Sequence, residues 1–329
     1  MLRAGEAAAG PGRQASIMTG TPDVSGAVGP RLNAARRLAG HGAAASLSLY
    51  LVVKVGWVAA ALFGHAPPDF GSTDWVVLNL VTVAMSAAGI VLGVVLAQGP
   101  KWHIPTAPLV FFAWVGSGFL VPLLPYAMVS AALGAGGDDG DSAPSWELTL
   151  IAIGFTGMAV GLAIALPIYM RERWPGAYLG RLTDRKRLAA RPARTASLVL
   201  TAPTVLWTYW SLGGTLGLDP AHRDLIDVNA RLLLGNSALW ALLGLWAIWA
   251  ITSARPNMPV WLPTTLAFTA SGSLFAWGGW RLAVALLRPG GYAPAEYPAV
   301  TVVEHSLAIA GGTLMLAILV KSIGDGRLR

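Results

Sequence analysis

Two titratable side chains stand next to each other near the start of an otherwise apolar stretch. Glu304 and His305 lie within "YPAVTVVEHSLAIAGGTLMLAILVK", residues 297–321. A carboxylic acid sequestered from water can stay protonated and act as a proton donor, and an adjacent imidazole can hold or resupply the proton. Successive helical residues point about 100° apart, so direct contact between the two is not required by the sequence. Glu304 is therefore a candidate acid catalyst assisted by His305, and the alternative interpretation is a buried ion pair or a capping carboxylate at the helix start.

A second carboxyl group, Glu147, occupies a matching position earlier in the chain. "ELTLIAIGFT" begins at Glu147 and "EHSLAIAGGT" begins at Glu304. An ionisable group inside a membrane span costs about 2.5–3.5 kcal/mol on insertion scales, so it should find a partner or water. We expect Lys54 to be the leading partner of Glu304 and Arg281 the second. Glu147 is a second candidate acid, although its place beside Trp146 also fits a solvated carboxylate at the membrane interface.

Aromatic side chains are unusually frequent, with 14 tryptophans in the chain. Those near the ends of apolar segments are typical of interfacial anchors. Deeper aromatic residues can line an apolar cavity, where their π faces would stabilise a cation, or they can simply pack between helices. The candidates for substrate binding are Trp57, Trp207, Tyr209, Trp210, Trp277 and Trp280.

Composition favours a membrane protein and excludes several kinds of chemistry. The 329 residues are 55% hydrophobic and 12% charged, with a mean hydropathy of +0.59, which is unusual for a soluble domain. Cysteine is absent, so disulfides and thiolate chemistry are excluded. There is no HExxH motif, no closely spaced histidine pair and no Walker-type loop, so we expect neither a metal site nor a cofactor. Asp138, Asp139 and Asp141 are more typical of a solvated loop than of a divalent-ion site.

Hydropathy predicts an all-α, polytopic integral membrane protein. A spanning helix needs about 20 mainly apolar residues, and helices satisfy their own backbone groups in lipid. Eight segments qualify as transmembrane helices: 44–64, 75–98, 106–133, 147–170, 196–217, 231–253, 258–287 and 299–321.

The distribution of charge predicts the orientation. Most of the 23 Lys and Arg residues fall on one side of the membrane if the N-terminus is cytoplasmic. We therefore expect a bacterial cell-membrane protein with both termini in the cytoplasm. Residues 1–42, rich in Ala, Gly, Pro and Arg, should form a disordered basic tail. Residues 171–195 should form a basic cytoplasmic linker that could also contact anionic lipid.

The linker separates two similar halves, 43–170 and 196–329. "ASLSLYLVVKVGWVAAALFG" from Ala45 matches in outline "ASLVLTAPTVLWTYWSLGGTLGL" from Ala196, and "PLVFFAWVGSGFL" matches "PTTLAFTASGSLF" in the same order. A common vocabulary of small and apolar helix residues explains part of this likeness, and we favour a duplicated four-helix unit. Four helices per unit give both copies the same orientation, so the sequence predicts a parallel 4+4 internal repeat, unlike the inverted repeats of many transporters.

Two motifs in the second half resemble a family of small four-helix membrane proteins of unknown function from high-GC bacteria. These are "TYWSLGGTLGL" (Tyr209, Trp210, Gly213 and Gly214) and "RPNMPVWLPTTLAF" (Arg255, Pro259, Trp261 and Pro263). The first half keeps only Trp57 and "KWHIPTAPLVFFAW". The resemblance implies two tandem copies of a membrane four-helix unit, and it implies no reaction.

Two functional hypotheses from different classes remain. In the first, Glu304 protonates an olefin or epoxide of a lipid-soluble isoprenoid and aromatic faces guide the carbocation, a plan similar to that of the membrane-bound terpene cyclases of meroterpenoid pathways. A nearby Lys54 ammonium would oppose this role because it favours the ionised carboxylate. In the second, the protein is a transporter or small-molecule-binding protein with Glu304, Lys54 and Arg281 forming a polar site. Both imply a lipid-soluble small molecule and membrane lipids as partners, and no nucleic acid.

Overall fold

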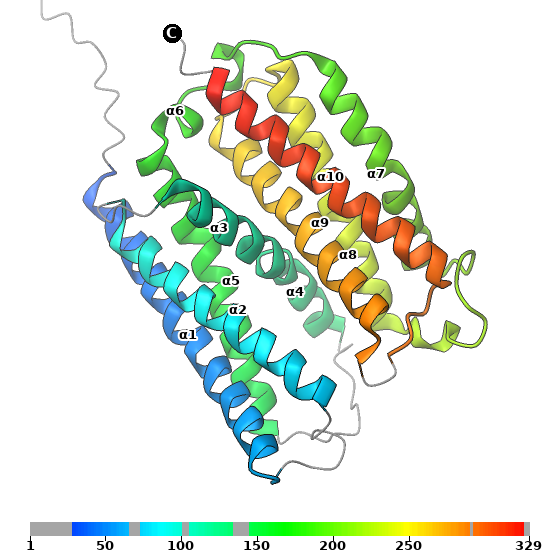
Figure 1. The fold of residues 1–329 in the computed structure, drawn as a ribbon. Coiled ribbons are helices and arrows are strands. Elements are labelled where there is room, and N and C mark those ends of the chain that lie inside the picture. The colour runs from blue at the N-terminus through cyan, green and yellow to red at the C-terminus, as the bar shows by residue number, and fades with distance from the viewer. Residues whose placement is uncertain (1–27, 66–72, 101–104, 134–144, 290–291, 326–329) are drawn as a thin grey trace, which may run out of the picture.

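A computed structural model of the chain describes residues 28–65, 73–100, 105–133, 145–289 and 292–325. The regular structure of these residues is helical (Figure 1), and two isolated bridges are the only β pairings among them. The predicted all-α class is therefore confirmed.

Each of the eight predicted segments overlaps a long helix or a pair of helices. The long elements are α1 (Pro30–Leu62), α2 (Thr73–Gln98), α3 (Thr106–Leu120), α4 (Leu123–Leu133), α5 (Ser145–Arg173), α7 (Ala190–Ser211), α8 (Val228–Ser253), α9 (Trp261–Leu287) and α10 (Pro298–Asp325). The short ones are α6 (Pro175–Tyr178), η2 (Leu182–Asp184) and η3 (Arg223–Leu225).

Six helical segments in the described residues are long and apolar enough to cross a membrane. They are α1, α2, the pair α3 and α4, α5, α8 and α10. The helices α7 and α9 fall outside this set. The first turns of α7 carry Arg191 and Arg194, and α9 contains Arg281 together with several small polar residues. Much of α9 is buried among other helices, where a helix does not need the apolar surface that lipid requires.

The predicted disordered tail is wrong for the part that the structure describes. α1 begins at Pro30, so residues 30–42 are helical. Proline is well suited to the first helical position, where its missing N–H would have no partner anyway, and the alanines that follow are the best helix formers. The predicted linker 171–195 is likewise partly helical, because α5 runs on to Arg173 and α7 begins at Ala190. Residues 1–27 lie outside the described part of the chain.

The third predicted span is two helices rather than one. The break between α3 and α4 falls at Val121 and Pro122. Pro122 has no N–H to continue the ladder, and the side chain of Asn236 in α8 donates a hydrogen bond of 2.9 Å to its carbonyl oxygen. A partner from another helix therefore satisfies the backbone at the break.

Figure 1 shows two groups of helices with α3 and α4 between them. In one group α1 packs against α2 and α5, and in the other α7 packs against α8 and α10 while α9 packs against α8 and α10. α3 joins the groups by packing on α9. At that contact the Trp114 indole stacks on Phe275 with ring centroids 4.6 Å apart, and its Nε1 donates to Ser271 Oγ at 2.9 Å.

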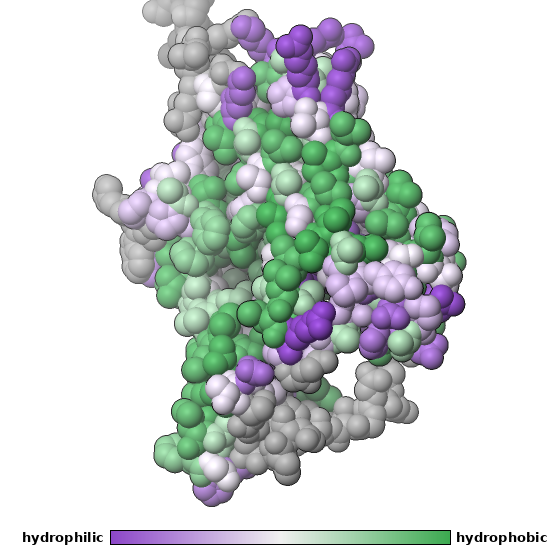
Figure 2. Space-filling model, turned by 45° about the vertical axis from the view of Figure 1, so that its right-hand side comes forward, coloured by the Kyte–Doolittle hydropathy of each residue, from purple (hydrophilic) through white to green (hydrophobic). Residues whose placement is uncertain are grey.

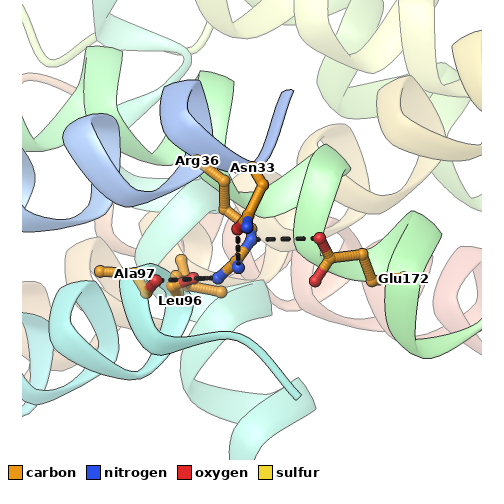
Figure 3. Close-up of polar contacts among 5 residues, drawn as sticks. All are labelled: Asn33, Arg36, Leu96, Ala97 and Glu172. Carbon is orange, nitrogen blue, oxygen red and sulfur yellow. Dashed lines mark hydrogen bonds and ion pairs between the residues drawn. The ribbon is translucent and has the colours of Figure 1, made fainter. Parts of the chain in front are cut away.

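A buried arginine ties the start of α1 to the ends of α2 and α5 (Figure 3). Arg36 is 4% exposed. Its Nη1 donates to the carbonyls of Leu96 and Ala97 at 2.5 and 2.9 Å, and its Nη2 donates to Asn33 Oδ1 at 2.6 Å. Its Nε lies 3.4 Å from Glu172 Oε1. The guanidinium thus satisfies terminal carbonyls of α2 and complements the negative end of that helix.

The face of the bundle drawn in Figure 2 is largely hydrophobic between its two ends. Figure 2 shows hydrophobic residues covering the middle of the molecule, with hydrophilic residues gathered at the end where α10 ends and α7 begins. Large apolar side chains are exposed on helix flanks, among them Leu198, Leu239, Leu286, Val303 and Val320. A continuous apolar surface of this kind is what lipid tails cover in a membrane-like protein.

Candidate functional site

Glu304 and His305 are buried inside the second group of helices. They lie two turns into α10, and only 1% of Glu304 and 3% of His305 is exposed. The two side chains do meet, because His305 Nε2 lies 3.3 Å from Glu304 Oε1. The α9 backbone approaches closely here, since a Cβ on Gly278 would lie 3.2 Å from the His305 carbonyl oxygen.

The carboxyl group of Glu304 makes no hydrogen bond of ordinary geometry with the residues that the structure describes. Among the described residues, neither of its oxygens nor His305 Nδ1 makes a hydrogen bond, and the contact with His305 Nε2 does not have hydrogen-bond geometry. A buried polar group without a partner costs about 1–3 kcal/mol, and more when it is charged. Few such groups occur in folded proteins, so this one marks the site.

Trp207 on α7 faces this pair from across the helix contact. Its indole is near enough to Glu304 to interact with the carboxyl group, yet its Nε1 makes no hydrogen bond of ordinary geometry. Thr204, one turn earlier on α7, also has a buried hydroxyl without a partner within the described chain. Arg281 and Glu296 lie within electrostatic range of Glu304. The expected pairing of Arg281 with Glu304 is thus a longer-range interaction and not an ion pair.

Backbone hydrogen bonds join two loops at the end of the bundle where α10 begins. The N–H of Tyr297 donates to the Gly217 carbonyl at 3.1 Å, and the N–H of Asp219 donates to the Ala295 carbonyl at 2.9 Å. These bonds hold the segment after α7 against the segment before α10. Nearby, partial burial and then the Glu296 carboxylate raise the pKa of the Tyr292 hydroxyl, while Arg281 lowers it.

Lys54 is not the partner of Glu304, which corrects the expectation from sequence. Its Nζ donates to Asn79 Oδ1 at 3.0 Å and lies 4.0 Å from the centre of the Trp57 ring. The carboxylate within its electrostatic range is Glu147. All of these contacts are in the first group of helices, so Lys54 balances the other acid.

Glu147 has a defined partner rather than only solvent. Trp57 Nε1 on α1 donates to Glu147 Oε2 on α5 at 2.8 Å. Each group of helices therefore places an indole opposite a glutamate, Trp57 with Glu147 and Trp207 with Glu304. Sequence reasoning named all four residues but missed this pairing. The available signal was a similar spacing along the chain. Trp57 precedes Glu147 by 90 residues, and Trp207 precedes Glu304 by 97 residues.

The six predicted aromatic residues have different contacts. Trp207 is near enough to Glu304 to interact with its carboxyl group. Trp210 is fully buried and its Nε1 donates to the Leu216 carbonyl at 2.8 Å, whereas Tyr209 is 42% exposed. Trp277 donates to the Phe119 carbonyl at 3.1 Å in the contact with α3. Trp57 lies in the other group, and Trp280 is partly exposed. Three of the six thus hydrogen-bond within the helix packing, and a role of the set in substrate binding stays a prediction.

Metal ligands are not assembled in the described part of the chain. No three His, Asp or Glu side chains there come together as a metal site would require. The loop with Asp138, Asp139 and Asp141 lies outside the described residues.

Comparison with known proteins provides no relative. No family model matches the chain, and no curated protein or solved structure matches it either. The resemblance to small four-helix membrane proteins therefore stays a prediction.

Proposed function

We propose that this chain is an integral membrane protein of the transporter or small-molecule-binding class, with a proton-binding site at Glu304. In this proposal eight helices span a cell membrane as two parallel quartets, with both termini in the cytoplasm. The helices α7 and α9 complete the second quartet. Support comes from the packing, because α1 contacts α2 and α5 as α7 contacts α8 and α10.

The observation that carries the proposal is the buried carboxyl group of Glu304, which makes no hydrogen bond of ordinary geometry within the described part of the chain. An ionised carboxylate in apolar surroundings is costly without a paired charge. A proton on the carboxyl group removes that charge, and a bound molecule with a hydrogen-bond donor supplies the missing partner. Binding of such a molecule is then coupled to the loss or gain of the proton.

The two indole–glutamate pairs differ in the residue that lies three positions before the tryptophan. Three residues before Trp57 the chain has Lys54, whose ammonium compensates Glu147. Three residues before Trp207 it has Thr204, which carries no charge. Glu147 is also partly exposed, whereas Glu304 is not. The pair of Trp57 and Glu147 is therefore a structural contact. In the pair of Trp207 and Glu304, the carboxyl group has no ammonium nearby among the described residues, so its charge depends on whether it binds a proton.

The isoprenoid cyclase hypothesis has less support. A cyclase needs aromatic faces around the cation that its acid creates, whereas Trp57, Trp210 and Trp277 make hydrogen bonds of their own in the helix packing. Two cavities among the described residues lie elsewhere, one at the 175–192 segment and one around Tyr169. A buried acid beside one indole therefore supports proton binding more directly than it supports cyclisation.

Infrared spectroscopy of the full chain in lipid bilayers tests the proposal. The carbonyl band of a protonated carboxylic acid is recorded at a series of pH values for the wild type, Glu304→Gln and the matched control Glu147→Gln. We expect a titrating band in the wild type and in Glu147→Gln that is missing from Glu304→Gln. An unchanged band in Glu304→Gln contradicts the proposal.

Product analysis separates the two functional classes. Purified protein is incubated with prenylated aromatic compounds, and the products are identified by mass spectrometry. We expect no cyclised product from the wild type. A cyclised product that disappears in Glu304→Gln would instead favour the enzyme.

A further inference from the structure

The ends of α7, α8 and α10 surround an open cavity that is separate from Glu304. Its volume is about 890 Å³, within the range of small-molecule sites. Residues 175–192 form one side, and α10 forms the other. Five cationic side chains line it, against a single carboxylate, Asp184. The cations are Arg181, Arg185, Lys186, Arg187 and Lys321.

Two of these cations have structural partners. Arg181 Nε donates to Asn257 Oδ1 at 2.5 Å, and the Asp184 carboxylate accepts from the Arg181 backbone N–H at 3.1 Å. Arg185 donates to the carbonyls of Gly176 and Leu179. These bonds fix the shape of the loop and use the one acid in the cavity.

The other three cations are exposed and have no hydrogen bond or ion pair within the described part of the chain. They are Lys186, Arg187 and Lys321. The N-terminus of α7 opens beside them. Its cap, Ala189, supplies no side-chain hydrogen bond, and its first turn has no acidic residue. Free backbone N–H groups and the positive end of a helix dipole attract anions, phosphate above all.

The α10 side of the cavity changes from apolar to charged along one face. Leu314, Ala317, Ile318 and Lys321 all line it, and their spacing places them on a single helix face. Leu314, Ala317 and Ile318 precede Lys321 on α10, so they lie farther from the charged end of the helix. A free inorganic anion would use only the charged end, whereas a lipid would use the whole face.

We infer that this cavity binds an anionic phospholipid, with the phosphate between Lys186, Arg187, Lys321 and the start of α7, and an acyl chain along Leu314, Ala317 and Ile318. Basic pockets between membrane helices are suited to such headgroups. This inference does not depend on proton binding at Glu304, and Glu304→Gln leaves the cavity unchanged.

Lipid binding to the purified full chain in an uncharged detergent tests the inference. The probes are a short-chain phosphatidylglycerol, phosphatidylcholine with the same chains, and inorganic phosphate, each titrated while retained lipid and thermal unfolding are measured. We expect phosphatidylglycerol to bind and stabilise the protein, and the other two to do so at least tenfold less well. Equal binding of phosphatidylcholine contradicts a charged site, and a full effect of inorganic phosphate alone shows a free-anion site instead.

Matched variants locate the site. Removing two cations in Lys186→Ala/Lys321→Ala should weaken phosphatidylglycerol binding about 30-fold, because each surface cation contributes about 1 kcal/mol to anionic lipid binding. Arg31→Ala/Arg37→Ala removes two exposed cations from the start of α1 and should leave binding unchanged. Equal loss in both doubles would mean general charge attraction and would overturn the assigned site.

A third variant tests the apolar part of the cavity. Ala317→Trp fills the space beside α10 and leaves every charge in place. It should weaken phosphatidylglycerol and leave weak phosphate binding unchanged. Unaltered lipid binding in this variant contradicts the placement of the acyl chain. As a control, a cooperative thermal unfolding transition recorded without lipid shows that each variant is folded.

Discussion

Arg36 makes the sharpest prediction at the scale of single residues. Arg36→Ala leaves Glu172 and the Leu96 and Ala97 carbonyls without their buried partner. Removing one member of a buried ion pair costs about 3–5 kcal/mol. We expect a loss of that size in the free energy of unfolding, measured by tryptophan fluorescence in mild detergent. Arg37→Ala, an exposed neighbour on α1, is the control and should change stability little. Equal unfolding of the two variants would refute the role of Arg36.

Trp57 makes a second residue-scale prediction. Trp57→Phe keeps an aromatic face for Lys54 and removes the donor to Glu147. A hydrogen bond to a charged group contributes about 1.5–3 kcal/mol, and partial exposure of Glu147 favours the lower end. The unfolding free energy should fall by about 1.5 kcal/mol. Trp146→Phe alters an exposed indole on α5 and should have no effect, so an identical loss in both variants would count against the hydrogen bond.

Residue types were readable from the sequence, but their partners were not. Glu304, Glu147 and both tryptophans stand out because charge and indole groups are unusual in apolar segments. Their pairing depends on which helices are neighbours, and Trp57 and Glu147 are 90 positions apart. A linear match from Ala45 to Ala196 sets Trp57 opposite Thr208, one residue from Trp207. For the same reason the sequence pairs Lys54 with Glu304, whereas the structure places it near Glu147.

At the scale of elements, helix positions follow hydropathy while helix ends follow local chemistry. The start of α1 depends on Pro30 and the break after α3 on Pro122. α7 ends before the predicted 217, and Gly213 follows it with a φ of +93° that favours glycine. Hydropathy averaged over a window of residues does not show the effect of a single proline or glycine on where a helix ends.

The contact between α3 and α9 supports a prediction about glycine. A Cβ on Gly118 would lie 2.1 Å from the Gly272 backbone carbon, so Gly118→Ala must push the helices apart. Small residues allow such close approach in membrane helices. We expect a lower midpoint of thermal unfolding, measured by circular dichroism in detergent.

The same helix contains its own control. A Cβ on Gly116 would meet only Leu92 and Leu162 side chains, at 3.6 and 4.0 Å. Gly116→Ala should be neutral or slightly stabilising, since alanine is the better helix former by about 1 kcal/mol. If Gly118→Ala is as stable as Gly116→Ala, α3 and α9 are not in the close contact described.

At the scale of the whole molecule, we expect α7 and α9 to cross the membrane together with the six more apolar segments. α7 separates Thr183 from Ala221, and α9 separates Asn257 from Ala293. If both helices span, Thr183 and Asn257 lie on one side and Ala221 and Ala293 on the other. The positive-inside rule places the first two in the cytoplasm, beside the basic segment 171–195.

Labelling of single introduced cysteines tests on which side of the membrane each position lies, because the chain has no cysteine of its own. Thr183→Cys, Ala221→Cys, Asn257→Cys and Ala293→Cys are each treated with a membrane-impermeant maleimide on intact and on permeabilised cells. We expect Ala221→Cys and Ala293→Cys to react in intact cells, and the other two only after permeabilisation. Reaction of Thr183→Cys and Ala221→Cys from the same side would mean that α7 does not cross, which would remove the second quartet. An anionic phospholipid in the cytoplasmic leaflet reaches the cavity at the start of α7 only if Thr183 lies on the cytoplasmic side, so this measurement also constrains where that lipid binds.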